Sequence, residues 1–407
     1  MGILNSTEQA ISEITTPYKE KIYHLIKPLI LPMTKNVFKK INPVVGIVFL
    51  FFLLLSCGGT AKGREHSAEK KEQDSIPEYR RLRFLFLGDI MSHKPQVDAA
   101  WDGKQKKHDF KPVFDAVSSY FKGADLVIGN LETTFGGEPY TGYPTFSSPD
   151  ILASDLRDVG VDILTTANNH TCDRGNKGVI RTLDILDGVG IRSTGSFRSE
   201  EDYRMRNPLV IDTLGVKIAF LAYTYGTNGI PFFEPVRVNL IDAIAIKNDL
   251  EKVKALGADF IIASMHWGIE YSLTPSGDQK KEAQWLADNG VDAIVGMHPH
   301  VVQPSDTLLS SGGKSVPVVY SLGNFISNQY QPYTRLGKML SMQIGIDRQN
   351  RISIEEWKEH YTFVARRTGR PNRYLIVPAD SVQRYQDTFS EEDKAEWKRI
   401  ARFLKLF

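Results

Sequence analysis

From Leu82 onward, short runs of apolar residues alternate with longer stretches whose apolar residues recur at helical spacing. The short runs predict strands buried on both faces, and the longer stretches predict amphipathic helices. The predicted strands cover residues 83–91, 124–132, 161–170, 258–268, 291–300 and 316–325, with a hairpin over 211–224 that turns at Leu214 and Gly215. The predicted helices cover residues 110–123, 151–160, 175–190, 241–257 and 280–290. This alternation predicts an α/β fold in which helices cover the sheets.

The last part of the chain has a different pattern. Residues 338–366 predict two antiparallel strands with a turn near residues 347–350. Residues 390–407 predict a terminal helix, because Ser390 can cap it and acidic side chains fill its first turn. We expect residues 81–389 to form one domain, in which the two antiparallel strands complete a sheet.

The segment before this domain has the pattern of an export signal. Residues 44–55 form an apolar run that follows several lysines and is shorter than the roughly 20 residues that a membrane-spanning helix needs. The run ends in Leu-Leu-Ser-Cys-Gly, which resembles the lipobox of bacterial lipoproteins, whose cysteine becomes the acylated first residue of the mature chain. We therefore expect an exported protein that is anchored to the bacterial cell envelope by a lipid on Cys57.

The start of the chain is long for such a signal. A start at Met33 would give the leader a conventional length, so we hypothesise that translation begins there rather than at Met1. Residues 1–57 then contain the leader, and residues 58–80, which are polar and charged, predict a flexible tether between lipid and domain.

Composition excludes several classes of protein. The 50 Lys and Arg residues balance 48 Asp and Glu residues, for a net charge of +2, which argues against a nucleic-acid partner bound through excess positive charge. Two cysteines exclude a disulfide-rich scaffold and a four-cysteine zinc site. The nine histidines are then the main candidates for binding a transition metal.

Polar side chains suited to metal binding or acid–base chemistry follow five of the predicted strands, and the carboxyl ends of such strands meet at one edge of a sheet. They are Asp89, Glu132, Asn169, His170, His266, His298 and His300, with His93 shortly after the first strand. Taken singly, each has a structural alternative: a helix cap for Asp89, a turn for the Asn169–His170 pair, a hydrogen-bonded core position for His266. Their repeated placement at strand ends predicts one shared site.

Imidazole, carboxylate and amide ligands together suit divalent ions such as Mn, Fe or Zn. The set is larger than the four ligands of a single zinc ion. We therefore expect two divalent metal ions, about 3.5–4 Å apart and bridged by a carboxylate.

Six motifs occur in a characteristic order along residues 80–330, namely GDIM, GNLE, TTANNHTCDRG, HWGIEY, GMHPHVVQP and YSLGNF. With these motifs the chain resembles the CapA family of capsule or poly-γ-glutamate synthesis, a branch of the calcineurin-like metallophosphoesterases. The resemblance implies a four-layer α/β sandwich, in which two mixed sheets lie between layers of helices.

The resemblance also implies roles for the strand-end residues. Asp89 would bind the first metal, Asn169 and His266 the second, and the His298–His300 pair would divide between the two. His170 would be the catalytic residue, beside the leaving group of the substrate. The substrate side would be lined by four residues: Trp267, Glu270, Tyr271 and Asn324.

Two positions depart from the pattern of the superfamily. Met91 stands where a histidine ligand is usual, and we expect His93 to replace it. Asn130 stands where the bridging aspartate is usual, and we expect Glu132 to bridge instead. Both changes bear on how fully metals occupy the site.

Two functions follow, and the resemblance supports each. The ligand set implies a metal-dependent phosphoesterase or related hydrolase acting at the cell envelope, and two-metal sites also cleave amides such as a γ-glutamyl bond. The family name implies a non-hydrolytic partner in making, exporting or anchoring an anionic capsule polymer, alongside membrane proteins of capsule synthesis. A phosphoester or an anionic polymer is the corresponding partner molecule.

The leader yields a first prediction. Sequencing the unprocessed precursor should find Met33 at its amino terminus, and mass spectrometry of the mature protein should find lipid on Cys57. A Cys57→Ser variant should then leave the membrane fraction. A precursor that begins at Met1, or a Cys57→Ser variant that stays with membranes, would contradict the two parts of this interpretation.

Overall fold

Two β-sheets packed face to face form the centre of the structure, a computed structural model that describes residues 79–369 and 372–405. These residues belong to one compact unit, Ile76–Phe407. The predicted leader, Met33, Cys57 and nearly all of the predicted tether lie outside the described residues. None of the described helices is long and apolar enough to cross a membrane.

The first sheet has the strand order β18-β17-β16-β1-β4-β5-β6, and β15 pairs with the end of β1. Strands β1, β4, β5 and β6 are parallel, whereas β16, β17 and β18 extend the sheet in antiparallel pairs. The strands are β1 (Arg80–Ile90), β4 (Leu126–Leu131), β5 (Ile163–Thr165), β6 (Arg192–Thr194), β15 (Asn324–Ile326), β16 (Leu336–Ile346), β17 (Ile352–Arg366) and β18 (Tyr374–Pro378).

The second sheet has the strand order β13-β14-β12-β11-β9-β8. Its four central strands are parallel, and β8 and β13 are antiparallel edge strands. The strands are β8 (Leu209–Thr213), β9 (Val216–Thr224), β11 (Phe260–His266), β12 (Ala293–Met297), β13 (Ser305–Leu309) and β14 (Ser315–Val319). Two small pairs complete the strands, β2 (Trp101–Asp102) with β3 (Lys107–His108) and β7 (Ser196–Phe197) with β10 (Arg237–Val238).

Alternating side chains of β1 explain why the sheets form layers. Phe84 and Phe86 point into the core between the two sheets, where they meet Phe220 of β9 and Ile262 of β11. Leu85 and its equivalents point the other way, under the helices outside the first sheet. A strand buried on both faces needs apolar residues at every position, which is the pattern of its sequence.

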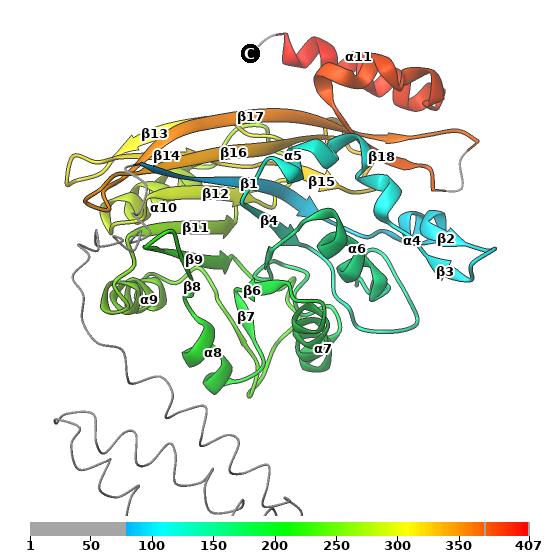
Figure 1. The fold of residues 1–407 in the computed structure, drawn as a ribbon. Helices are drawn as coiled ribbons and strands as arrows, with labels where there is room; N and C mark the ends of the chain where they lie inside the picture. The colour runs from blue at the N-terminus through cyan, green and yellow to red at the C-terminus, as the bar shows by residue number, and fades with distance from the viewer. Residues whose placement is uncertain (1–78, 370–371, 406–407) are drawn as a thin grey trace, which may run out of the picture. The chain divides into compact units, whose positions relative to one another are not determined.

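Helices cover both outer faces (Figure 1). Outside the second sheet lie α9 (Ala243–Ala255) and α10 (Gly277–Asp288), whose apolar sides complete the core there. Outside the first sheet lie α5 (Ser118–Lys122), α6 (Ile151–Val159) and α11 (Glu391–Leu404). The remaining helices are α4 (Lys94–Ala100), α7 (Gly175–Gly188) and α8 (Glu200–Arg206), with the 3-10 turns η1 (Lys111–Val113), η2 (Asp115–Val117), η3 (Ala379–Arg384) and η4 (Gln386–Thr388). The predicted α/β architecture of two mixed sheets between helices is confirmed.

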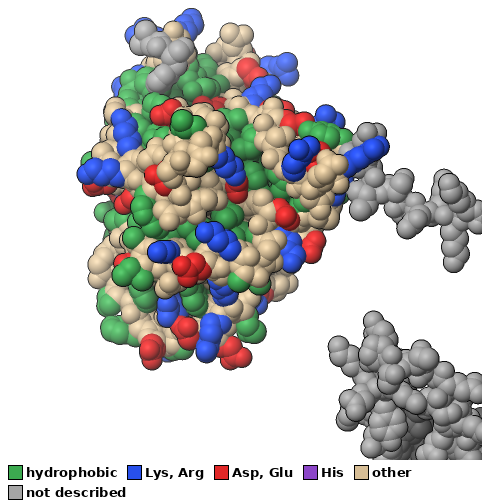
Figure 2. Space-filling model, turned by 90° about the vertical axis from the view of Figure 1, so that its left-hand side faces the viewer, with side chains coloured by type: hydrophobic (Ala, Val, Ile, Leu, Met, Phe, Trp, Pro, Cys, Tyr) green, Lys and Arg blue, Asp and Glu red, His purple; other side chains and the backbone are tan. Residues whose placement is uncertain are grey.

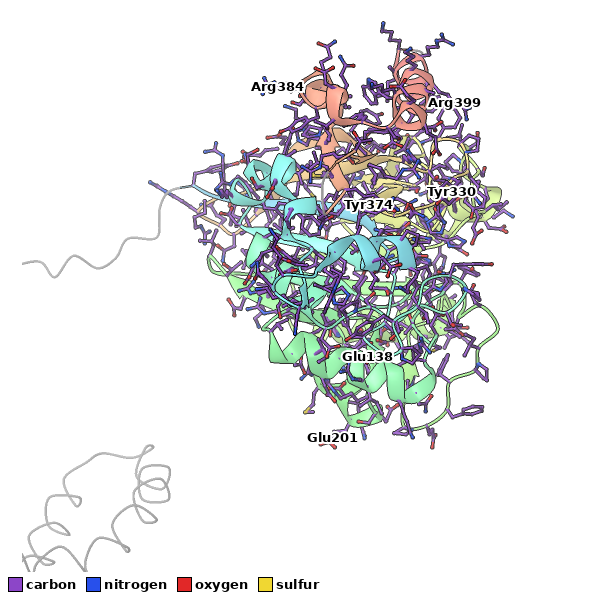
Figure 3. The ribbon with its side chains drawn as sticks, turned by 90° about the vertical axis from the view of Figure 1, so that its right-hand side faces the viewer. Glu138, Glu201, Tyr330, Tyr374, Arg384 and Arg399 are labelled. Atoms are coloured by element: carbon purple, nitrogen blue, oxygen red, sulfur yellow. The ribbon has the colours of Figure 1, made fainter. Side chains whose placement is uncertain are left out.

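Helices mark the two ends of the molecule. Figure 3 shows α11, which carries Arg399, at the opposite end from α8, which carries Glu201. The terminal helix begins as predicted, because the Ser390 hydroxyl accepts a hydrogen bond from the backbone N–H of Asp393 at 3.1 Å. The predicted hairpin over residues 338–366 is also confirmed, and it completes the first sheet by pairing β16 with β1.

Three predicted elements were wrong in extent. The predicted helix over residues 110–123 is divided into η1, η2 and α5, because its backbone N–H groups bond to carbonyls three residues back while its apolar side chains stay buried. The predicted strand over 161–170 is only β5, and a loop follows. The predicted strand over 316–325 is two strands, since the chain leaves the second sheet after β14 and enters the first at β15.

The crossing between the sheets depends on two glycines. A Cβ atom on Gly88 would lie 2.0 Å from the carbonyl oxygen of Gly323, which accepts a hydrogen bond from the Asp89 N–H at 3.0 Å. Only a residue without a side chain allows the two backbones to come this close. Asp89 therefore owes its position to a contact that no other residue type permits.

We expect Gly88→Ala to lower the free energy of unfolding by about 1–3 kcal/mol, because buried backbone must move to make room. Gly188→Ala is the matched control: Gly188 is the exposed last residue of α7, and a Cβ there meets nothing within 4 Å. Urea unfolding of the two purified variants measures the difference. Equal midpoints would show that the contact at Gly88 does not constrain the fold.

Candidate metal centre

The carboxyl ends of strands from both sheets meet at one side of the molecule. Figure 3 looks onto this side, where Glu138 and Tyr330 mark the loops that follow β4 and β15. On the opposite face, seen in Figure 2, basic and acidic side chains are interspersed and no described histidine is visible. The strand ends bring seven of the predicted residues into one buried cluster, each at most 3% exposed: Asp89, Glu132, Asn169, His170, His266, His298 and His300.

Glu132 lies at the centre of this cluster. It follows β4 directly, and its Oε1 atom is 3.7 Å from Nε2 of His266 and 3.7 Å from Nε2 of His300. Two groups that can hold a metal ion share it, Glu132 with His266 and His298, and Glu132 with Asp89 and His300, with ligand atoms within 4.8 Å of one another. One carboxylate thus serves ligands that come from both sheets.

The chemistry of the residues present fits a divalent cation. Glu132 is fully buried, and neither of its carboxylate oxygens accepts a hydrogen bond. Burial, followed by the negative charge of Asp89, raises the pKa of Glu132 well above its ordinary value. A buried carboxylate without donors is destabilising unless a cation compensates its charge.

The histidines are in the form that binds metals. Burial lowers the pKa of His298 to about 3, and burial lowers the pKa of His266 well below its ordinary value. Both imidazoles are therefore neutral near pH 7, as metal ligands must be. The Nδ1 atom of His298 has no hydrogen-bond partner, which leaves it available to an ion.

Asn130 orients two of the candidate ligands. Its Nδ2 atom donates to Oδ1 of Asp89 at 2.8 Å and lies 3.3 Å from Nδ1 of His266. Its own Oδ1 accepts from the hydroxyl of Thr165 at 3.1 Å, which fixes the amide. Sequence reasoning treated Asn130 only as a missing bridging carboxylate. The side chain is a positioning residue, and its direct contact with β1 and β11 could not be read from the motif.

Asn324 orients His300 in the same way. Its Oδ1 atom lies 3.0 Å from Nδ1 of His300, and its Nδ2 donates to the carbonyl of Thr334 at 2.9 Å. Since Nδ1 of His300 also faces Oδ2 of Asp89 at 3.3 Å, this nitrogen carries the proton and Nε2 is left for a metal. Asn324 is completely buried, so it contacts the ligand histidine rather than the substrate side where it was expected.

His170 is held by an acidic partner. Its Nδ1 atom lies 2.8 Å from Oδ2 of Asp173, which also accepts the backbone N–H of Phe146 at 2.6 Å. The imidazole packs edge-to-face on the Phe146 ring at 4.7 Å. Nε2 of His170 therefore remains free to exchange a proton.

Cys172 is excluded as a nucleophile near neutral pH, because burial raises the pKa of its thiol to about 12.

His93 lies beside the cluster, at the start of α4. Its Nδ1 atom is 3.2 Å from Oε1 of Gln96 and 3.3 Å from the backbone nitrogen of Asn328, and burial lowers its pKa to about 4. None of the metal-binding groups found among the described residues includes it. Its expected role as a ligand in place of Met91 remains a prediction.

Of the residues expected on the substrate side, one more is buried away from the site and two are exposed beside it. Trp267 is buried in the core outside the second sheet, and its indole N–H donates to the carbonyl of Tyr320 at 3.0 Å, so a substrate cannot reach it. Glu270 and Tyr271 are exposed, and the Glu270 carboxylate forms a third possible metal group with His298 and His300. Sequence reasoning missed Tyr225, whose ring lies 4.6 Å from that of His298.

A family match and two relatives with similar sequences support the resemblance that the order of the motifs indicated. The family described as bacterial capsule synthesis protein PGA_cap matches residues 83–329. The capsule biosynthesis protein CapA of Bacillus anthracis is 28% identical over 306 residues, covering 72% of this chain and 70% of that protein. The PGA biosynthesis protein CapA of Bacillus subtilis is 29% identical over 336 residues, covering 78% and 79%.

Solved structures are less similar. The NAD nucleotidase of Haemophilus influenzae has a TM-score of 0.47 and 14% identity, covering 81% of this chain and 60% of that one. The calcineurin-like phosphoesterase YfkN from Bacillus subtilis has a TM-score of 0.41 and 18% identity, covering 70% and 90%. The match of the family to more than half of the sequence decides the assignment: this chain belongs to the bacterial capsule synthesis protein PGA_cap family.

Proposed function

We propose that this chain is a metal-dependent phosphoesterase of capsule or poly-γ-glutamate biosynthesis, with a centre of two divalent ions and a lipid anchor at Cys57. One observation carries the proposal. Two metal-binding groups share Glu132, whose buried oxygens have no hydrogen-bond donor. A carboxylate between two sets of ligands is the arrangement that bridges two ions.

The donor set supports this reading. Asp89 and His300 would hold one ion, His266 and His298 the other, and Glu132 both. The Oδ1 atom of Asn169 lies 2.8 Å from Nε2 of His266, so this amide would join the second ion. Imidazole with carboxylate favours Mn, Fe or Zn over Ca or Mg.

Bound divalent ions would supply Lewis acidity toward a phosphoryl oxygen and an activated water as nucleophile. The residues of the chain do the rest. In hydrolysis, oxygen from water bonds to phosphorus, the ester P–O bond breaks, and the leaving oxygen takes a proton. His170 is placed to give that proton from Nε2, while Asp173 holds Nδ1 and stabilises the imidazolium from which it comes. A low-dielectric, water-poor site strengthens each of these interactions.

Hydrolysis and metal content of the purified chain test the proposal together. We expect two metal ions per chain, and manganese-dependent turnover of an aryl phosphodiester or monoester. Two ions without turnover of either ester would contradict the hydrolase and favour a non-hydrolytic role in polymer synthesis, export or anchoring. A chain that binds no metal would contradict the centre itself.

Glu132→Gln should reduce metal content from two ions to one or none, because an amide cannot bridge two cations. Glu251→Gln is the matched control, since Glu251 is an exposed residue of α9 on the outer side of the second sheet. Elemental analysis of both variants after dialysis against manganese gives the result. Wild-type metal content in Glu132→Gln would rule out a bridging role.

His170→Ala should separate catalysis from metal binding. We expect its kcat to fall about 10²–10⁴-fold, the usual contribution of a general acid, with metal content unchanged. His298→Ala should instead lose metal. His360→Ala, which removes a histidine on β17 that faces Ser341, should change neither quantity. Equal metal content in His170→Ala and His298→Ala would contradict the division of roles.

A further inference from the structure

Two exposed tyrosines flank the histidines that would hold the ions. The ring of Tyr225 lies 4.6 Å from that of His298, and the ring of Tyr271 lies 6.1 Å from that of His300. Tyr225 is 49% exposed and Tyr271 is 37% exposed, so both side chains reach solvent beside the candidate ligands, and we call the place where they do so the entrance of the site.

The backbone fixes both tyrosines relative to the histidines. The N–H of Tyr225 donates to the carbonyl of His266 at 3.1 Å, and the N–H of Tyr271 donates to the carbonyl of Pro299 at 2.8 Å. Tyr271 has a left-handed backbone, with φ of 65°, which a residue with a side chain seldom adopts without support. The entrance is therefore built on the same segments as the ligands.

Glu270 adds a negative charge beside the two tyrosines. The carboxylate of Glu270 is exposed and lies within 4.8 Å of ligand atoms of both His298 and His300. Besides burial, the charges that raise the pKa of Tyr225 to about 12 are those of Glu270 and Glu132.

We propose that the substrate is a phosphoester that carries an alkylammonium group, bound at the entrance by Tyr225, Tyr271 and Glu270. The inference rests on the proposed hydrolysis and specifies its substrate class. Aromatic faces attract cations through the ring quadrupole, and quaternary ammonium groups are the ligands most often bound in this way. A carboxylate beside the rings adds Coulomb attraction.

The same charges disfavour a different substrate. A polyanion entering the site would place its next negative group against Glu270, and this juxtaposition of like charges disfavours binding. Because Glu270 lies so close to the ligand histidines, the ammonium group must be separated from phosphorus by a short linker. A zwitterionic phosphodiester of an amino alcohol has this form.

A pair of isosteric esters tests the proposal. The substrate with an ammonium group is the zwitterion p-nitrophenyl phosphocholine, and its isostere without that group is the monoanion p-nitrophenyl 3,3-dimethylbutyl phosphate, in which carbon replaces the ammonium nitrogen. For the wild-type chain loaded with manganese, we expect kcat/KM to be at least about tenfold higher for the choline ester. A ratio near one, or one that favours the ester without the ammonium group, would overturn the proposal.

Variants test whether the three entrance residues cause the preference for the choline ester. Glu270→Gln, Tyr225→Leu and Tyr271→Leu should each bring the ratio of the two esters toward one. Glu251→Gln and Tyr79→Leu are the matched controls, because Glu251 is exposed on α9 and Tyr79 is an exposed residue just before β1, at the other end of the strand. Metal content is measured in every variant. Loss of metal in Glu270→Gln would make Glu270 a metal ligand instead and would overturn its part in binding the ammonium group.

A binding measurement separates this inference from the proposed function. Calorimetry compares phosphocholine with 3,3-dimethylbutyl phosphate on the manganese-loaded wild-type chain. Tighter binding of phosphocholine, even with neither ester hydrolysed, would support the substrate class while the proposed hydrolysis fails. Equal binding would overturn the substrate class even if both esters are hydrolysed.

A phosphoester with an alkylammonium group can be a soluble molecule or the headgroup of a lipid. Release of choline or phosphocholine from glycerophosphocholine in solution would support the proposal with a soluble source. Release from phosphatidylcholine vesicles alone would support it with a membrane source.

Discussion

The buried carboxylate of Glu132 is the feature on which the site depends. An ionised carboxylate without hydrogen-bond donors in a protein interior costs on the order of several kcal/mol. In this chain the same carboxylate faces two histidines that come from different places in the sequence. Either a proton or a bound cation removes this cost, so the protonation of Glu132 and the binding of cations are energetically linked. Asn130, Asn324 and Asp173 have the complementary task of fixing which atom of each neighbour points inward.

The two sheets supply the cluster because their parallel strands end on the same side. Asp89 and Glu132 come from the first sheet, whereas His266 and His298 come from the second. The glycine contact lets the segment that arrives from the second sheet pass close to β1 at Gly88 and Gly323, and the backbone N–H of His298 reaches Oδ2 of Asp89 at 3.3 Å. Packing of the core between the sheets thus determines the geometry of the ligands.

Much of this could be predicted from the sequence, because strands and helices alternate clearly and carboxylate, amide or imidazole side chains follow the apolar runs at five strand ends. The candidate ligands were recognisable for that reason. The positioning roles of Asn130 and Asn324 were not, since they depend on contacts between strands that are far apart in the sequence. The family resemblance implied a place on the substrate side for Trp267, which follows His266 directly. Adjacent residues in an extended segment point to opposite faces, so one faces the site and the next faces the core.

The segment 316–325 shows a further limit of sequence patterns. Its apolar run is continuous, and nothing in the order of residues indicates that it leaves one sheet and joins another. The change of sheet is decided by the packing of Gly323, which has a φ of 66° and is close to backbone atoms of Val301 and Leu336. A local pattern cannot reveal a constraint that arises from three separate segments of the chain.

The most direct test of the account is an anomalous diffraction map of crystals grown with manganese. The account predicts two peaks about 3.5–4 Å apart, with the Glu132 carboxylate touching both. A single peak, or two peaks that Glu132 does not bridge, would contradict the claim that this carboxylate organises the site.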